Sequence, residues 1–145
     1  MPDPVKDACE ANFAAHADDC SGFARAVAQR LGVTLTGLAN QIVDTIRDSP
    51  EWTPLDDGVA AAQAAAAGKF VLGGLRGDEQ THRDAHGHVV VVVAGRPLNR
   101  DKYPFAYWGR LGGGGKENET VNFAWRAEDR DNVTYAAHDI APRVA

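Results

Sequence analysis

Apolar and polar positions divide the chain into a first part with helical spacing and a second part with strand spacing. In the first part, apolar residues recur every three to four positions, as on the buried face of a helix. Phe23, Val27 and Leu31 form the clearest stripe, and Gly32 follows it as a helix stop. The pattern predicts helices over residues 5–13, 20–31, 38–46 and 59–67.

After Gly68 the spacing becomes that of β-strands. The valine run 89–93 is typical of a strand that is buried on both faces. Strands are predicted over residues 70–75, 86–94, 102–108, 121–125 and 133–138, with a turn at the glycine run 112–115. Helices followed by an antiparallel sheet define an α+β fold, and we expect residues 1–145 to form a single domain.

Composition and charge narrow the function classes. Hydrophobic residues make up 44% and charged residues 24% of the 145 residues, as in an ordinary globular domain. The net charge of −5, without a cluster of Lys and Arg, argues against a nucleic-acid partner. The longest apolar run is too short to cross a bilayer, and residues 1–20 lack the apolar stretch of a signal peptide. We therefore expect a protein made in the cytoplasm without a signal peptide and without a membrane partner.

The strongest candidate for chemistry is Cys20, in the segment Asp-Cys-Ser-Gly-Phe at residues 19–23. Asp18 or Asp19 is suited to cap a helix that begins there. A cysteine in the first turn lies at the positive end of the helix dipole, which is expected to lower its pKa and to favour the thiolate. Ser21 and Gly22 leave the approach to the sulfur open, and their backbone N–H groups are candidates for stabilising an oxyanion.

A second candidate is His88, which enters the valine strand two residues after His86. Strand alternation places both histidines on the face of Val90 and Val92. A histidine fixed at the start of a buried strand can take a thiol proton and return it to a leaving amine. A cysteine followed by a strand histidine is the chain order of papain-like enzymes, so we predict Cys20 as nucleophile and His88 as general base. His86 is expected to be a loop-end residue near the site.

Other interpretations of these residues remain open at this point. Cys20 could be a small core residue or could form a disulfide with Cys9, the other of the two cysteines. His82, Asp84, His86 and His88 have a spacing that could hold a zinc ion, which would make the protein a metal-binding module rather than an enzyme.

The cysteine segment and the stretch Gly87 to Val92 resemble the motifs of NlpC-type papain-like cell-wall peptidases. The chain resembles in particular the first family of type VI secretion amidase effectors, and the similarity extends roughly from Cys9 to Tyr135. The features that point to this branch are Leu31-Gly32-Val33, the alanine-rich helix, Lys102-Tyr103-Pro104, the glycine run, Trp125, Asp129-Arg130-Asp131 and Tyr135.

The resemblance implies a monomeric papain-like domain that cleaves peptidoglycan stem peptides between D-glutamate and diaminopimelate. It implies Cys20 as nucleophile, His88 as base and acid, and no metal or other cofactor. It also implies delivery by a type VI secretion component into the periplasm of a target Gram-negative cell, and a cognate immunity protein. A housekeeping cell-wall hydrolase of the same superfamily is the alternative enzyme.

The sequence departs from the papain-like pattern at the group that would orient the imidazole. Residues 105–108 read Phe-Ala-Tyr-Trp and offer neither a carboxylate nor an amide. Asn99, Asp101 or a backbone carbonyl are the remaining candidates. Relatives carry further cysteines, some of them bridged, whereas only Cys9 accompanies Cys20 here, so a stabilising bridge is not expected.

Overall fold

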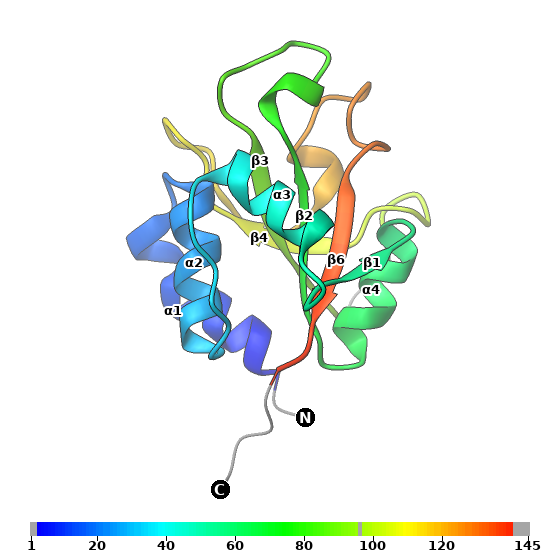
Figure 1. The fold of residues 1–145 in the computed structure, drawn as a ribbon. Coiled ribbons are helices and arrows are strands. Elements are labelled where there is room, and N and C mark those ends of the chain that lie inside the picture. The colour runs from blue at the N-terminus through cyan, green and yellow to red at the C-terminus, as the bar shows by residue number, and fades with distance from the viewer. Residues whose placement is uncertain (1–2, 96, 141–145) are drawn as a thin grey trace, which may run out of the picture.

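The computed structural model describes residues 3–95 and 97–140, which form four α-helices and one six-stranded sheet (Figure 1). The helices are α1 (Pro4–His16), α2 (Cys20–Arg30), α3 (Ala39–Asp48) and α4 (Gly58–Ala66). The strands are β1 (Thr53–Leu55), β2 (Phe70–Leu75), β3 (His88–Val93), β4 (Phe105–Trp108), β5 (Lys116–Thr120) and β6 (Thr134–His138), and two short 3-10 turns are η1 (Gly77–Glu79) and η2 (Val121–Phe123). None of the described helices is both long and apolar enough to cross a membrane.

The sheet has the strand order β1-β6-β2-β3-β4-β5, and every neighbouring pair is antiparallel. β2 and β3 lie in the middle and are buried along their whole length, as the valine run predicts. Their register pairs His88 with Leu75, which places His88 at the end of the central hairpin. The predicted α+β class is confirmed, and the arrangement agrees with the papain-like fold that the resemblance implies.

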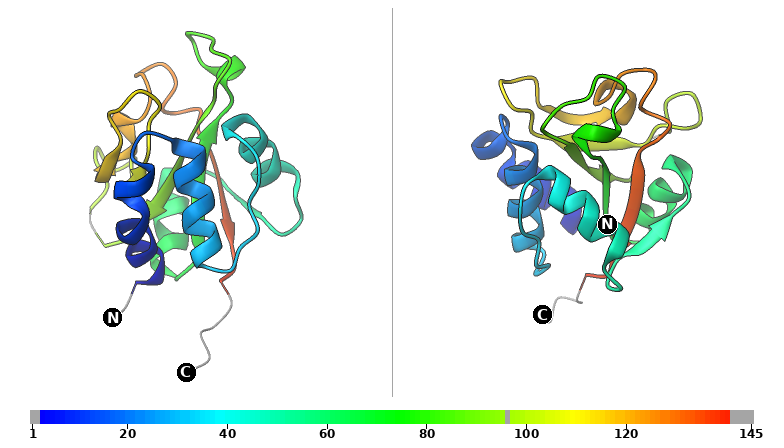
Figure 2. Two further views of the ribbon diagram at one scale, coloured as in Figure 1. Left: turned by 90° about the vertical axis from the view of Figure 1, so that its left-hand side faces the viewer. Right: turned by 45° about the horizontal axis from the view of Figure 1, so that its top comes forward.

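Alternating residues of β3 face two different apolar clusters. Val89 and Val91 pack in one cluster with the buried residues of α1, α2 and α3. Val90 and Val92 pack in the other with Ala61 of α4 and with residues around η2. Figure 2 shows α1 and α2 side by side in front of the first face. Helices therefore lie on both faces of the sheet.

One predicted strand was wrong and two edge strands were not predicted, each for an identifiable reason. Residues 121–125 alternate in polarity like a strand, but they form η2 and the turn after it, so that Val121 and Trp125 cover the sheet face. The strand of this region is β5, whose polar sequence carries no apolar alternation because it lies at the exposed edge of the sheet. The other edge strand, β1, has three residues with a proline in the middle and was not predicted.

Candidate active site

Cys20 is the first residue of α2, and the residues around it build the helix start that the sequence predicts. Asp19 is the N-cap, and its Oδ1 accepts hydrogen bonds from the Gly22 backbone N–H at 3.1 Å and from the Ser21 hydroxyl at 3.0 Å. The N–H of Gly22 is therefore already bound. The backbone N–H groups of Cys20 and Ser21 remain directed at the thiol.

The Cys20 side chain is half-buried and packs against the cluster beneath the helices, so its sulfur is directed toward the sheet as predicted. Burial raises the pKa of the thiol, and the nearby Asp19 carboxylate adds to this. Hydrogen bonds from the backbone N–H groups of Val89, Ser21 and Cys20 act in the opposite direction without cancelling the shift. The expected lowering of the pKa was wrong because desolvation outweighs the helix terminus.

His88 is the first residue of β3 and is only 8% exposed. Its ring meets Trp125 and Trp108 edge to face, with ring centroids 5.3 Å and 6.4 Å away. Burial, with a smaller contribution from the positive charge of Arg110, lowers the pKa of His88 to about 3. The imidazole is therefore neutral at neutral pH, and its Nε2 is buried without a hydrogen-bond partner within the described residues.

Cys20 and His88 line one cleft of about 490 Å³ at the end of the sheet. They reach it from opposite faces, since Cys20 belongs to the helix side and His88 contacts the tryptophans of the other side. No direct hydrogen bond joins the thiol to the imidazole in the described part of the chain, but the N–H of Val89, the residue after His88, reaches the sulfur. The other lining residues come from four segments: Asp19 and Ser21; Leu38, Ala39 and Asn40; Gln80, Asp84, Ala85, His86 and Gly87; and Arg110 and Leu111.

The two side chains considered for orienting His88 lie elsewhere. Asn99 donates to the Thr120 hydroxyl at 3.3 Å, and Asp101 is exposed in the same turn. Neither lines the cleft. The neighbours of the imidazole are instead Trp108 and Trp125. Trp108 could have been found from the sequence because it lies on the strand next to β3, whereas the position of Trp125 depends on η2.

The four residues considered as a zinc site, at positions 82, 84, 86 and 88, do not come together in the structure. His82 and His86 are exposed on the β2–β3 connection, while His88 is buried at its end. Asp84 accepts a hydrogen bond from the backbone N–H of His86 at 3.0 Å. Among residues 3–95 and 97–140, no three side chains of His, Cys, Asp or Glu come together in a metal-binding group. His86 lines the cleft, as expected of a loop-end residue.

The disulfide alternative for Cys20 was also wrong. Both cysteines are free thiols, and Cys9, which belongs to α1, is fully buried in the apolar cluster beneath the helices. Burial raises the pKa of Cys9 well above its usual value, with smaller contributions from the charges of Asp3 and Glu10. Cys9 is therefore a core residue and is chemically distinct from Cys20, which lines the cleft.

The residues near the C-terminal end that carried the family resemblance form a separate structural cluster. The Tyr103 hydroxyl donates to Asp131 Oδ1 at 2.7 Å, and the Arg130 guanidinium lies over the Tyr103 ring at 5.2 Å. Together with Tyr135 they line a second cavity of about 340 Å³ beside the start of α4. They connect the segment before β6 to the segment before β4 and do not line the cleft of Cys20.

No protein-family model matches the chain. Among curated proteins, the chain is similar to the peptidoglycan amidase Tse1 of Pseudomonas aeruginosa. The two sequences are 40% identical over 128 residues, which are 86% of this chain and 77% of that protein.

Proposed function

Since this chain belongs to the peptidoglycan amidase family of Tse1, we propose that it hydrolyses amide bonds in peptidoglycan stem peptides. The bond we assign is the one between D-glutamate and diaminopimelate, as the sequence resemblance implies. The observation that supports a cysteine mechanism is that Cys20 and His88 line the same cleft.

The pKa shifts of Cys20 and His88 suggest how the proton moves. The raised pKa of Cys20 and the lowered pKa of His88 keep a neutral thiol beside a neutral imidazole in the free protein. A neutral imidazole can accept a proton, so His88 takes the thiol proton as the sulfur attacks the amide carbon. Because Nε2 is buried, Nδ1 is the nitrogen we assign to this transfer.

The rest of the reaction follows from covalent catalysis. The C–N bond of the tetrahedral intermediate breaks, the amine leaves with the proton from His88, and the acyl group stays on Cys20 as a thioester. Water then gives a proton to His88 and attacks the thioester, which releases the carboxylic acid and restores the thiol. The N–H groups of Cys20 and Ser21 are the oxyanion donors we assign, because the Gly22 N–H is bound by Asp19.

We further propose that the protein acts as an antibacterial effector. In this proposal a type VI secretion component delivers it to the periplasm of a target Gram-negative cell, and a cognate immunity protein protects the producing cell. The segments that resemble the effector branch, Lys102-Tyr103-Pro104, Trp125, Asp129-Arg130-Asp131 and Tyr135, support this role.

Digestion of purified Gram-negative peptidoglycan tests the proposed reaction. Wild type and Cys20→Ala are compared, and the products are identified by mass spectrometry. We expect new fragments that end at D-glutamate with wild type and none with Cys20→Ala. Equal cleavage by the two proteins would exclude Cys20 as nucleophile, and fragments ending elsewhere would exclude the proposed bond.

A further inference from the structure

The connection between β2 and β3, residues 76–87, forms one wall of the cleft and leads directly into His88. In Figures 1 and 2 it projects beyond the end of the sheet. All six residues from Thr81 to His86 are exposed, so the connection buries little apolar surface of its own. Its position must therefore depend on polar contacts with neighbouring elements.

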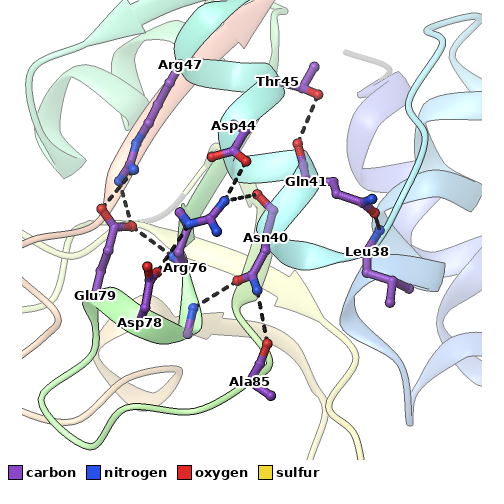
Figure 3. Close-up of polar contacts among 11 residues, drawn as sticks. Leu38, Asn40, Gln41, Asp44, Thr45, Arg47, Arg76, Asp78, Glu79 and Ala85 are labelled. Atoms are coloured by element: carbon purple, nitrogen blue, oxygen red, sulfur yellow. Dashed lines mark hydrogen bonds and ion pairs between the residues drawn. The ribbon is translucent and has the colours of Figure 1, made fainter.

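Asn40, in the first turn of α3, binds both arms of this connection (Figure 3). Its Oδ1 accepts a hydrogen bond from the Gly77 backbone N–H at 2.9 Å, and its Nδ2 donates to the Ala85 carbonyl at 3.0 Å. A single planar amide thus fixes one backbone position on each arm. The Asp84 N–H also donates to the Gly77 carbonyl at 3.0 Å, which closes the base of the connection beside the amide.

Asn40 also lies against the residue that precedes His88. A Cβ atom on Gly87 would be 2.6 Å from Oδ1 of Asn40 and 2.7 Å from the Leu75 carbonyl oxygen, so the backbone passes the amide in close contact. Asn40 itself lines the cleft. The amide is therefore placed where the wall of the cleft and the entry to His88 meet.

Other contacts of Figure 3 hold the outer side of the same connection. Arg76 binds Asp44 of α3, and Arg47 binds Glu79 at 2.8 and 2.9 Å. Outside that view, Arg47 also donates to the Thr134 hydroxyl at 2.7 Å. Arg47 does not line the cleft. Arg76 also donates to the backbone carbonyl of Asn40 at 3.4 Å, so Arg47 is the residue of this group that suits a control for Asn40.

We infer that Asn40 is a positioning residue, which sets the backbone entering His88 and the wall of the cleft through its two hydrogen bonds. The inference rests on the proposed function, in which His88 is the general base. A misplacement of a base by a fraction of an ångström lowers the rate of the chemical step more than it weakens substrate binding.

Two variants of Asn40 and one matched control test this role. Asn40→Ala removes both hydrogen bonds. Asn40→Asp keeps the shape and the acceptor for Gly77 but places an oxygen against the Ala85 carbonyl. Arg47→Ala removes hydrogen bonds from the outer side of the same connection, while Glu79 keeps its bond from the Arg76 N–H.

The measurements are urea unfolding, kcat and KM on a soluble muropeptide, and the pH dependence of Cys20 alkylation by iodoacetamide. We expect both Asn40 variants to lower kcat about tenfold or more with a smaller change in KM. The pH dependence of Cys20 alkylation in both Asn40 variants should become more like that of His88→Ala. Arg47→Ala should lose comparable stability and keep kcat within about twofold of wild type.

If both Asn40 variants kept the kcat and alkylation profile of wild type, Asn40 would have no positioning role. Alkylation does not require peptidoglycan, so it separates this inference from the proposed substrate. A wild type that cleaves no peptidoglycan, but whose alkylation profile depends on Asn40, would refute the proposed function and support the positioning of His88.

Discussion

The two walls of the cleft are built in different ways. The β2–β3 connection is held by hydrogen bonds to side chains. Asn40 binds its base. Further out, Oδ1 of Asp129 accepts hydrogen bonds from the backbone N–H and the hydroxyl of Thr81 at 2.9 and 2.7 Å. The segment after β4 contributes Arg110 and Leu111 to another part of the lining. Backbone hydrogen bonds of 3.0 Å hold that segment, from Arg110 to Ala17 and from Gly113 to Arg110, and Leu111 is 73% exposed.

This difference assigns different tasks to the walls. The braced wall, residues 76–87, continues into β3 and leads to His88, whose position must be fixed for the proton transfer that we propose. The segment of residues 110–115, the glycine-rich wall, carries neither of the proposed catalytic residues and makes few side-chain contacts, so it is suited to adapt to the substrate. A change in the braced wall should therefore lower kcat, and a change in the glycine-rich wall should act mainly on KM.

The largest effect is expected from His88→Asn, because this change removes the general base that we propose. We expect kcat on a soluble muropeptide to fall by about 10³-fold or more. His82→Asn is the matched control, since His82 is an exposed histidine of the same connection. Steady-state kinetics should show its kcat within about twofold of wild type. A comparable loss in the two variants would instead favour a shared role of the histidines in binding a metal.

A smaller effect is expected from Asp129→Ala, which releases the braced wall near Thr81. Asp129 is 2% exposed, so losing its hydrogen bonds should lower the free energy of unfolding by about 2 kcal/mol. Asp129→Asn keeps the acceptor at Oδ1 and is the control. Hydrogen exchange should accelerate at residues 80–86 in the alanine variant and stay unchanged at residues 111–115. Equal acceleration in both walls would mean that they are not independent.

The sequence predicted the local structure around the two proposed catalytic residues. Cys20 follows a capping aspartate at a helix start, and His88 begins an apolar strand, so each could be recognised within a few residues. The raised pKa of Cys20 and the lowered pKa of His88 both result from burial. Cys20 is buried because α2 packs against β3, and a local sequence pattern does not show this packing.

Asn40 and Trp125 show why the rest could not be predicted. Asn40 occupies a position in the first turn of a helix, and its amide acts on Ala85, 45 residues away in the chain. Trp125 was noted only for its resemblance to the effector branch. Its contact with His88 arises because residues 121–123 form a 3-10 turn rather than the predicted strand. Such roles are set by which segments the fold brings together.

The glycine-rich wall can be tested by Gly113→Ala. Gly113 has φ of 99°, and a Cβ there would meet no atom within 4 Å, so the substitution changes only the backbone preference. We expect a loss of about 1 kcal/mol in the free energy of unfolding and a change of about twofold in KM. Gly68→Ala is the matched control, with φ of 90° and equal open space, because Gly68 lies between α4 and β2 whereas Gly113 is two residues from Leu111, which lines the cleft. An equal change of KM in the control would show that the glycine-rich wall has no special effect on binding.

The smallest effect is expected from Arg110→Gln, which acts on His88 across the cleft. The pKa of His88 is about 3 in the folded protein, mainly because of burial and partly because of Arg110, against 6.5 in the unfolded chain. Below pH 6.5 the unfolded chain gains a proton that the folded protein does not take up until about pH 3, so acid lowers stability across this range. Removing the positive charge of Arg110 raises the pKa of His88 in the folded protein and narrows the pH range over which acid lowers stability.

The loss of unfolding free energy between pH 7 and pH 2, a range that extends below the folded pKa of His88 of about 3, should therefore be smaller in Arg110→Gln than in wild type. We expect a difference below about 1.4 kcal/mol, the value of one pKa unit, because burial is the larger cause. Arg110→Lys keeps the positive charge and should follow wild type in the same urea titrations. If Arg110→Gln were as acid-sensitive as wild type, the charge on the glycine-rich wall would not reach the imidazole, and the two walls would be electrostatically as well as structurally separate.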